Sequence, residues 1–308
     1  MISFASYGRK TYLRLRSTAM TYALDLDPDF RPTPTLDRLA AETFRFAGGE
    51  PHVKLPADAP VAGARVVVSQ RARSWDDLGL LAVAVDALRR AGAVRVELVL
   101  PYFPGARQDR VMVPGEPLTV KVYADFVNAL ALDAVTIYDP HSSVAPALLD
   151  RVRVVDNVGF AGAVLRQLPA ETVLVAPDAG AQKKVYHVAA ALGGRAVVEA
   201  GKRRDVRTGA LSGFHVYADA LAGAPCLVLD DICDGGGTFL GLAGALRDAG
   251  AGDLYLAVSH GIFSRGLDAL AGAYRRVYCT DAFATTPPHP ALTQVPLAGL
   301  LPADAPAS

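Results

Sequence analysis

The chain alternates short apolar runs with longer stretches in which apolar residues recur every third or fourth position. The short runs are rich in Val and Leu and predict buried strands, whereas the longer spacing predicts amphipathic helices. Strands are expected at residues 21–26, 64–70, 94–100, 134–138, 152–155, 172–176, 196–200, 226–229 and 254–258. Helices are expected at residues 76–91, 119–130, 160–167, 182–192 and 239–249.

Two early segments interrupt this alternation. Residues 44–55 contain two runs of strand character separated by Gly48 and Gly49, which predicts a hairpin. Residues 36–41 are compatible with either a short strand or a helical turn. Both segments lie between the first expected strand and the first long helix.

Alternation of strands and helices indicates an α/β protein, with mainly parallel sheets covered by helices on both faces and repeated in two similar halves. We expect an N-terminal domain over residues 1–157, a C-terminal domain over residues 158–292, and a tail over residues 293–308 that packs on the N-terminal domain. In parallel sheets, ligands gather at the carboxyl ends of the strands. Residues that directly follow strands are therefore the candidates for a functional site.

The composition of the chain limits which classes of binding partner and which cellular location are expected. The 308 residues include 31 basic and 31 acidic side chains, so net charge points to neither nucleic acid nor an anionic membrane surface. No apolar run reaches the roughly 20 residues that a membrane span needs. Cys226, Cys233 and Cys279 lack metal-ligand spacing, and a disulfide between the first two would obstruct a ligand near Asp230. A reducing, cytoplasmic location fits these features.

The first 19 residues carry four basic side chains and no acidic one. This composition is typical of a transit peptide, and a surface strand or a disordered leader fits it equally well. Met20 immediately precedes the first expected strand, so translation that begins at Met20 is a third interpretation.

The stretch from Cys226 to Thr238 concentrates polar chemistry behind a strand. Glycines 235–237 let backbone N–H groups turn toward an anion, and the helix expected after them points its positive end at the same place. Thr238 can donate its hydroxyl to a phosphate or cap the helix. The carboxylates of this stretch can accept hydrogen bonds from sugar hydroxyls or bind hydrated Mg²⁺. The structural alternative is a strand-to-helix turn that uses glycine for geometry and aspartate for solubility.

This stretch resembles the phosphoribosyl-pyrophosphate binding loop of type I phosphoribosyltransferases and ribose-phosphate pyrophosphokinases. The usual pattern is two acids, two apolar residues, Asp, Thr, Gly, Gly, Thr, and Gly235 stands here where the first Thr is expected. That difference removes one hydroxyl but keeps the backbone donors. The resemblance implies two domains of type I phosphoribosyltransferase-like fold. It also implies that ribose 5-phosphate is bound by Asp230, Asp231, Asp234, Gly235, Gly236, Gly237 and Thr238.

The segment Pro101–Arg110 discriminates between these two families. Considered alone, it could stack on a purine and reach a polyphosphate through its arginines, or it could be a solvated loop with local ion pairs. Its ten residues closely match the ATP-binding segment of ribose-phosphate pyrophosphokinases, which phosphoribosyltransferases lack. The resemblance implies that Arg107, Gln108 and Asp109 bind ATP.

Further segments match the same family in order between residues 44 and 301. Gly49 and Glu50 end a stretch similar to a nucleotide-binding segment, although Gly48 replaces an Asp. His141, in Asp-Pro-His-Ser, and Asp178, in Pro-Asp-Ala-Gly, correspond to positions that hold Mg²⁺ or lie near it. Without the resemblance, the simpler interpretations are a structural histidine after a strand and an aspartate in a glycine-bearing turn.

Two later segments complete the match. Lys202-Arg203-Arg204 resembles the family's mobile catalytic loop, which implies that Lys202 and Arg204 are catalytic. The chemistry needs cations there, because a transferring diphosphoryl group gathers negative charge. A solvated turn is the structural alternative. Residues 259–264 resemble the segment after the last core strand and are expected to support the fold more than the reaction.

The resemblance implies a ribose-phosphate diphosphokinase that transfers the β,γ-diphosphate of MgATP to the C1 hydroxyl of ribose 5-phosphate. It implies Mg²⁺ as the cofactor and a homo-oligomer, either a dimer or a hexamer. The likeness does not extend to residues 111–117, where regulated members carry basic residues and serines of an allosteric site. It also stops short of the amino end.

Two alternatives stay open at this point. A type I phosphoribosyltransferase would use the same glycine-rich loop but would leave the Pro101–Arg110 match unexplained. A non-catalytic regulatory paralogue would bind a catalytic partner, and such proteins commonly lose catalytic cations or metal ligands. The presence of Lys202, Arg204, His141 and Asp178 argues against the paralogue.

Overall fold

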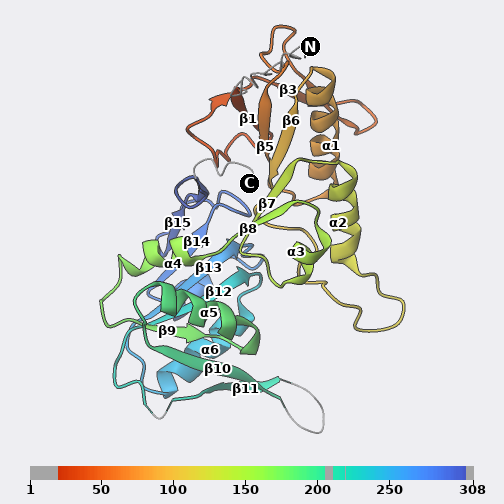
Figure 1. The fold of residues 1–308 in the computed structure, drawn as a ribbon. Coiled ribbons are helices and arrows are strands. Elements are labelled where there is room, and N and C mark those ends of the chain that lie inside the picture. Colours follow the sequence, from red (N-terminus) through yellow and green to blue (C-terminus); the bar gives the residue numbers. More distant parts are fainter. Residues whose placement is uncertain (1–19, 205–210, 219, 303–308) are drawn as a thin grey trace, which may run out of the picture.

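The computed structural model describes residues 20–204, 211–218 and 220–302, with the side chains of residues 202–204, 211 and 212 left aside. Two sheets form the frame, one in each half of the chain (Figure 1). The α/β architecture expected from the alternating pattern is confirmed. The expected leader over residues 1–19 lies outside the described residues.

The N-terminal sheet has six strands in the order β2-β1-β5-β6-β7-β8, and every neighbouring pair is parallel. The strands are β1 (Thr21–Asp25), β2 (Asp37–Arg38), β5 (Arg65–Ser69), β6 (Arg95–Val99), β7 (Ala134–Tyr138) and β8 (Val152–Val155). The helices are α1 (Trp75–Arg90), α2 (Thr119–Ala129) and α3 (Val144–Leu148). A separate antiparallel hairpin joins β3 (Glu42–Arg45) to β4 (Pro51–Lys54).

All three helices of this half pack into one apolar cluster on one face of the sheet. The expectation of helices on both faces is therefore wrong for the N-terminal sheet. The reason is topological: β5, β6, β7 and β8 follow one another across the sheet, and successive right-handed crossovers in one direction place every helix on the same side. The opposite face carries charge, since Glu97 meets Arg65, Arg95 and Arg153 there.

The C-terminal sheet has seven strands in the order β11-β10-β9-β12-β13-β14-β15, all parallel except the β10–β11 pair. They are β9 (Val173–Ala176), β10 (Val197–Arg204), β11 (Leu211–Val216), β12 (Cys226–Cys233), β13 (Leu254–Gly261), β14 (Arg276–Thr280) and β15 (Leu292–Val295). Helices cover both faces, as expected, because two separate apolar clusters flank this sheet. One cluster contains α4 (Val158–Leu165) and α5 (Ala179–Ala191), and the other contains α6 (Gly237–Asp248) and α7 (Asp268–Ala273).

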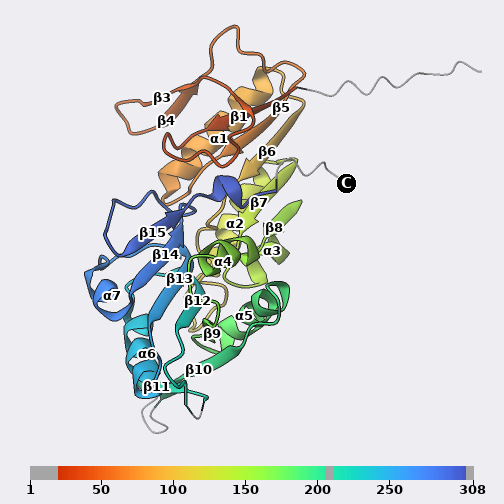
Figure 2. The same ribbon diagram turned by 90° about the vertical axis from the view of Figure 1, so that its left-hand side faces the viewer.

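Side chains from the N-terminal half enter the core of the C-terminal half. Phe30 and Tyr138 are fully buried in the cluster that also holds Leu297. Beside Phe30, the buried Arg71 donates from Nε to Asp27 and from a terminal nitrogen to Thr285, over 2.8 and 3.0 Å. These contacts hold the two sheets together, and Figure 2 shows β7 and β12 approaching one another at the junction.

The division into two domains near residue 157 stays a prediction, although the change from one sheet to the other falls between β8 and α4. The segment expected as a tail begins inside β15, which pairs with β14, and a short 3-10 helix (Leu297–Gly299) follows. No helix in the described ranges is both long and apolar enough to span a lipid bilayer.

Candidate functional site

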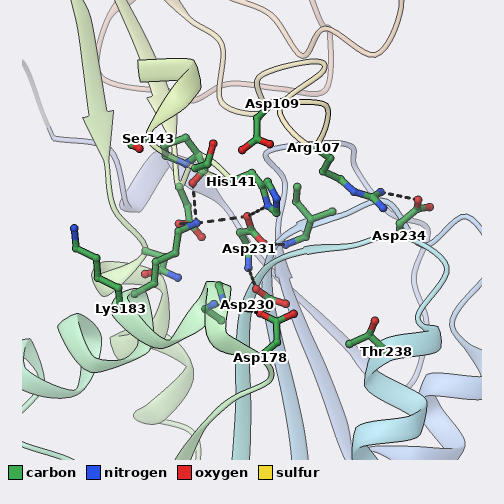
Figure 3. A pocket seen from close by; sticks show the side chains of 18 of the residues that line it. Arg107, Asp109, His141, Ser143, Asp178, Lys183, Asp230, Asp231, Asp234 and Thr238 are labelled. Atoms are coloured by element: carbon green, nitrogen blue, oxygen red, sulfur yellow. Dashed lines mark hydrogen bonds and ion pairs between the residues drawn. The ribbon is translucent and has the colours of Figure 1, made fainter. Parts of the chain in front are cut away.

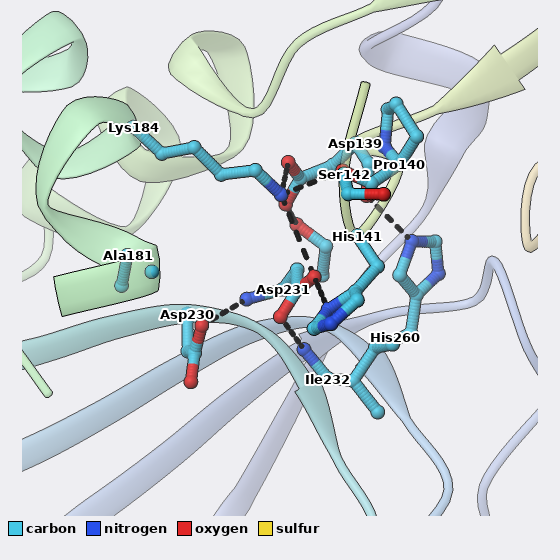
Figure 4. A network of polar contacts seen from close by, with 12 residues as sticks. Asp139, Pro140, His141, Ser142, Ala181, Lys184, Asp230, Asp231, Ile232 and His260 are labelled. Atoms are coloured by element: carbon cyan, nitrogen blue, oxygen red, sulfur yellow. Dashed lines mark hydrogen bonds and ion pairs between the residues drawn. The ribbon is translucent and has the colours of Figure 1, made fainter. Parts of the chain in front are cut away.

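The carboxyl end of β12 lies at the centre of the site. Its strand continues four residues further than the sequence predicted, so Asp230 and Asp231 lie within it. Their side chains face different surroundings because successive residues of a strand point to opposite sides. Figure 4 shows Asp231 turned toward His141 and Lys184, with Asp230 turned away from them.

Both carboxylate oxygens of Asp231 contact other groups of the protein. Its Oδ2 atom lies 2.7 Å from His141 Nδ1 and 3.5 Å from Lys184 Nζ, while Oδ1 accepts a 2.9 Å hydrogen bond from the Ile232 N–H. Burial acts to raise the pKa of Asp231, but the hydrogen bond from His141 and the charge of Lys184 outweigh it and lower the pKa. The Asp231 carboxylate therefore helps to position His141, and its predicted contact with ribose 5-phosphate stays a prediction.

Lys184, on α5, was missed by sequence reasoning. Its Nζ lies 2.9 Å from Asp139 Oδ1 and 2.7 Å from the Pro140 carbonyl, in addition to its contact with Asp231. Burial acts to lower the pKa of Lys184, but the carboxylates of Asp139 and Asp231 raise it overall. The ammonium thus joins the segment after β7 to the end of β12. The one sequence signal for Lys184 is its position shortly after Asp178, on a helix that begins at the site.

Residues at the end of β13 form hydrogen bonds with the segment after β7. Ser259 donates its hydroxyl to Asp139 Oδ2 over 2.6 Å, and Nε2 of the buried His260 lies 3.0 Å from the Tyr138 carbonyl. Burial lowers the pKa of His260, so its neutral form is favoured and Nε2–H is the donor. Ser259 and His260 thus support the position of Asp139, which agrees with the structural role expected for this segment.

Asp230 is an acid of the site that forms no ion pair with a described residue. Its Oδ1 atom accepts a 2.9 Å hydrogen bond from the Asp231 N–H, and no cation of the described residues pairs with it. Burial raises the pKa of Asp230 well above its usual range, and the nearby charges of Asp231 and Asp178 add to that effect. A carboxyl in this condition binds a proton or attracts an external cation.

The glycine-rich turn opens α6. Gly236 is the N-cap residue and adopts a left-handed conformation with φ 77°, whereas the helix begins at Gly237 and no side chain caps it. The first N–H groups of the helix consequently have no partner in the helix itself and point to the end at which an anion would bind. Thr238 lies in this first turn, as expected.

An ion pair closes the site on its other side. Arg107 donates to Asp234 Oδ2 over 2.8 Å, and Ser264 donates its hydroxyl to Asp234 Oδ1 over 2.6 Å. The hydrogen bonds from Ser264 and then Arg107 lower the pKa of Asp234. The contact links the segment expected to bind ATP to the loop expected to bind ribose phosphate (Figure 3).

A cavity of about 850 Å³ joins these groups. Residues from both halves of the chain line it, and its size is within the range of small-molecule sites. The predicted site residues in its lining are Arg107, Asp109, His141, Asp178, Asp230, Asp231, Asp234, Gly235, Gly236, Gly237 and Thr238. A neighbouring cavity of about 540 Å³ shares Arg107 and Asp109 and is also lined by Gln108.

Other predicted residues are placed elsewhere. Gly49 and Glu50 line neither cavity, because they belong to the turn and start of the β3–β4 hairpin, at the far end of the N-terminal half (Figure 2). They therefore lie apart from the other predicted site residues, and their contact with ATP stays a prediction. Lys202 and Arg204 lie in β10, which runs past the expected strand end and pairs with β11. Their side chains lie outside the described residues.

The predicted metal ligands do not form a closed cage. Asp178 caps α5, since its Oδ1 atom accepts hydrogen bonds from the N–H groups of Gly180 and Ala181 at 3.0 and 3.3 Å. The described parts of the chain contain no group of three or more His, Cys, Asp or Glu side chains placed to hold a metal ion. The donors present suit an ion that brings most of its ligands with a substrate.

Comparisons with known proteins agree with this arrangement. A family model described as the N-terminal domain of ribose phosphate pyrophosphokinase matches residues 34–130. A ribose-phosphate pyrophosphokinase of Pasteurella multocida is 33% identical over 264 residues, which cover 83% of this chain and 82% of the relative. One of Shewanella oneidensis is 35% identical over 225 residues, covering 71% and 70%. The crystal structure of phosphoribosylpyrophosphate synthetase from Mycobacterium smegmatis superimposes with a TM-score of 0.76 at 27% identity, covering 91% of this chain and 95% of that one.

Proposed function

The chain belongs to the ribose-phosphate pyrophosphokinase family, and on that premise we propose that it transfers the β,γ-diphosphate of MgATP to the C1 hydroxyl of ribose 5-phosphate. The products are phosphoribosyl pyrophosphate and AMP. The observation that supports the proposal is a shared cavity in which the Arg107 segment of one half faces the Asp230–Thr238 loop of the other. Transfer between two substrates requires such a shared space.

The ribose-phosphate side of the cavity is the start of α6. Backbone N–H groups at Gly237 and Thr238 would hold the 5-phosphate, with help from the helix dipole. Asp230 and Asp234 would accept hydrogen bonds from ribose hydroxyls. Since Asp234 is already paired with Arg107, the sugar has to compete with that arginine for the carboxylate.

The nucleotide side is the loop after β6. Arg107 and Gln108 would contact the polyphosphate and purine, and the buried Asp109 would keep the loop in place through Arg110, which donates to it over 3.0 Å. Lys202 and Arg204 are proposed to stabilise the charge on the transferring diphosphoryl group. Alignment and charge neutralisation suffice here, so no residue has to be a dedicated general base.

Mg²⁺ fits the donors of the site. Asp230 is a half-buried carboxyl that forms no ion pair with a described residue, and His141 uses Nδ1 for Asp231, which leaves Nε2 as its free ring nitrogen. Asp178, Asp230 and His141 would hold the ion together with phosphate oxygens of ATP, the arrangement Mg²⁺ prefers. The ion would neutralise charge on the triphosphate. Because the hydrogen bond to Asp231 raises the pKa of His141, this histidine would have to lose its proton to bind the metal.

The proposal is tested by incubating the full chain with ATP, Mg²⁺ and ribose 5-phosphate and quantifying AMP and phosphoribosyl pyrophosphate together. Equal amounts of both that depend on ribose 5-phosphate are expected. Failure to form either product, with phosphate added and other nucleotides tried, would contradict it. Consumption of added phosphoribosyl pyrophosphate in the presence of a nucleobase would then identify a phosphoribosyltransferase instead.

A further inference from the structure

The outer half of β10 depends on β11 for its position. β10 pairs with β9 over Val197–Glu199, and from Ala200 to Arg204 its one strand partner among the described residues is β11. A ribbon of two strands is at best marginally stable by itself. The place of the Lys202 backbone, which lies in this outer half, is therefore set by whatever β11 packs against.

Phe214 packs β11 against α6. Its backbone lies opposite that of Lys202 in the β10–β11 ladder, and its half-buried ring borders the apolar cluster that contains α6. Val216, two residues further and so on the same face of β11, is buried in that cluster. Between them, His215 is exposed and contacts the ring of Tyr217. One face of β11 is thus turned toward α6 and the other toward solvent.

The ring of Phe214 meets α6 at Gly241, where a side chain has no room. A Cβ atom on Gly241 would lie 2.7 Å from Cδ2 of Phe214, closer than real Cβ atoms approach other atoms, and 3.3 Å from Cζ. Gly241 is not among the glycines with positive φ, so its backbone does not require glycine. Glycine inside a helix destabilises it relative to alanine. The close approach of the Phe214 ring accounts for a glycine at this position.

This contact joins two parts of the proposed site. Gly241 lies about one helical turn after Gly237 and Thr238, the α6 residues proposed to hold the 5-phosphate. Phe214, on the other side of the contact, lies opposite Lys202, the proposed catalytic residue. A single side-chain contact therefore sets the backbone at Lys202 relative to the helix at which the sugar phosphate would bind.

We infer that Phe214 is a positioning residue for the transfer step, because its packing on Gly241 fixes the Lys202 end of β10 relative to α6. This inference rests on the proposed function and deepens it. Phe214 lines neither cavity, so it is not placed to contact a substrate. Its loss should therefore slow the transfer, which depends on the placement of charge, and leave the binding of both substrates in place.

The kinetic test compares the wild-type chain with Phe214→Ala, Phe214→Leu and His215→Ala. The Phe214→Ala variant should lower kcat about tenfold to hundredfold, since a displacement of roughly 1 Å can cost that much in rate. The KM values for ATP and ribose 5-phosphate should stay within about twofold. Phe214→Leu keeps part of the apolar contact and should lie between. His215→Ala, on the solvent-facing side of the same strand, is the matched control and should keep its kcat.

Amide hydrogen exchange gives a second readout, which needs no turnover. In Phe214→Ala, the amides of β10 from Ala200 onward should exchange at least about tenfold faster, whereas those of β12 and β13 should exchange as in the wild type. Gly241→Ala should have the same two effects, on exchange and on kcat, because its methyl group displaces the ring. In the Phe214→Ala background, Gly241→Ala should change neither further, since residues in contact do not act independently.

Faster exchange with an unchanged kcat would reduce Phe214 to a structural contact and overturn the inference. Unchanged exchange in Phe214→Ala, or an equal loss of kcat in His215→Ala, would also overturn it. A thermal melt checks that each variant is folded, and if Phe214→Ala is not, Phe214→Leu and Gly241→Ala carry the comparison. A wild-type chain that forms no phosphoribosyl pyrophosphate would refute the proposed function, whereas faster exchange in Phe214→Ala would still establish that this residue fixes the end of β10 on α6.

Discussion

A terminal nitrogen of Arg107 lies 2.8 Å from Oδ2 of Asp234, although 127 residues separate the two along the chain. The arginine belongs to the proposed nucleotide loop and the aspartate to the proposed ribose loop. Both side chains are about two-fifths exposed, so substrates can reach them. In the proposed function, ATP has to displace Asp234 from Arg107, and ribose 5-phosphate has to displace Arg107 from Asp234.

Replacing Arg107 should change the KM values for the two substrates in different ways. Arg107→Ala is expected to raise the KM for ATP about tenfold or more, because it removes a charge-assisted contact to phosphate. The KM for ribose 5-phosphate should stay the same or fall, since Asp234 is released. Steady-state kinetics with each substrate varied in turn measures both. Arg90→Ala, which removes an exposed ion pair on α1, is the matched control. An equal rise in both KM values would contradict the competition.

Lys184 should contribute more to the free energy of unfolding than its neighbour Lys183. Lys184→Met keeps the stem but leaves Asp139 and Asp231 without their shared cation, and such a loss costs about 3 kcal/mol or more. Lys183 makes no ion pair with another described residue and points away from the aspartates in Figure 3. Lys183→Met should therefore leave the thermal midpoint nearly unchanged. Similar melting curves for the two variants would show that the Lys184 contacts contribute little.

Lys202→Ala should lower kcat by several orders of magnitude with a modest effect on the KM values, since the proposed contact forms with the transferring group. Arg204→Ala should behave similarly. Lys54→Ala, at an exposed position of β4, is the control for a lost surface charge. A near-normal turnover number for Lys202→Ala would contradict the proposed catalytic role of Lys202.

Glu97 should make the stability of the N-terminal sheet depend on pH. Burial acts to raise its pKa, but Arg65, Arg153 and Arg95 together lower it below its ordinary value of 4.5. A lowered carboxyl pKa stabilises the fold above the ordinary value, and this contribution is lost as pH falls through the folded pKa.

The corresponding variant is Glu97→Gln, compared with Asp86→Asn, which alters an exposed pair on α1. Thermal midpoints at about pH 7 and about pH 4 measure the effect. The gap between wild type and Glu97→Gln should be clear at the higher pH and shrink at the lower one. Asp86→Asn should differ little from wild type at either pH, as surface pairs contribute little. A pH-independent gap would argue against the charge as its cause.

Much of the fold is predictable because it depends on local pattern. Runs such as β7 and β8 have the apolar character of buried strands and appear at the predicted residues. The family resemblance also implied that Arg107, His141, Asp230 and Asp234 serve one site, and all four line the same cavity although they lie at or after the ends of strands in two different sheets. The helix predicted over residues 239–249 is present as α6, which begins two residues earlier, at Gly237.

What sequence reasoning missed depends on contacts between distant segments. Lys184 carries no signal until α5 is placed against the end of β7, and the same packing brings Asp231 against His141. The β10–β11 hairpin was missed because Lys202-Arg203-Arg204 has no apolar alternation.

The central claim is that a diphosphoryl group, rather than a single phosphoryl group, is transferred. The most direct measurement uses ATP with a radioactive β-phosphate, together with Mg²⁺ and ribose 5-phosphate, and separates the products. Label in phosphoribosyl pyrophosphate, with unlabelled AMP in equal amount, is the predicted result. Label that remains in ADP, or that appears as free diphosphate without a sugar product, would contradict the account.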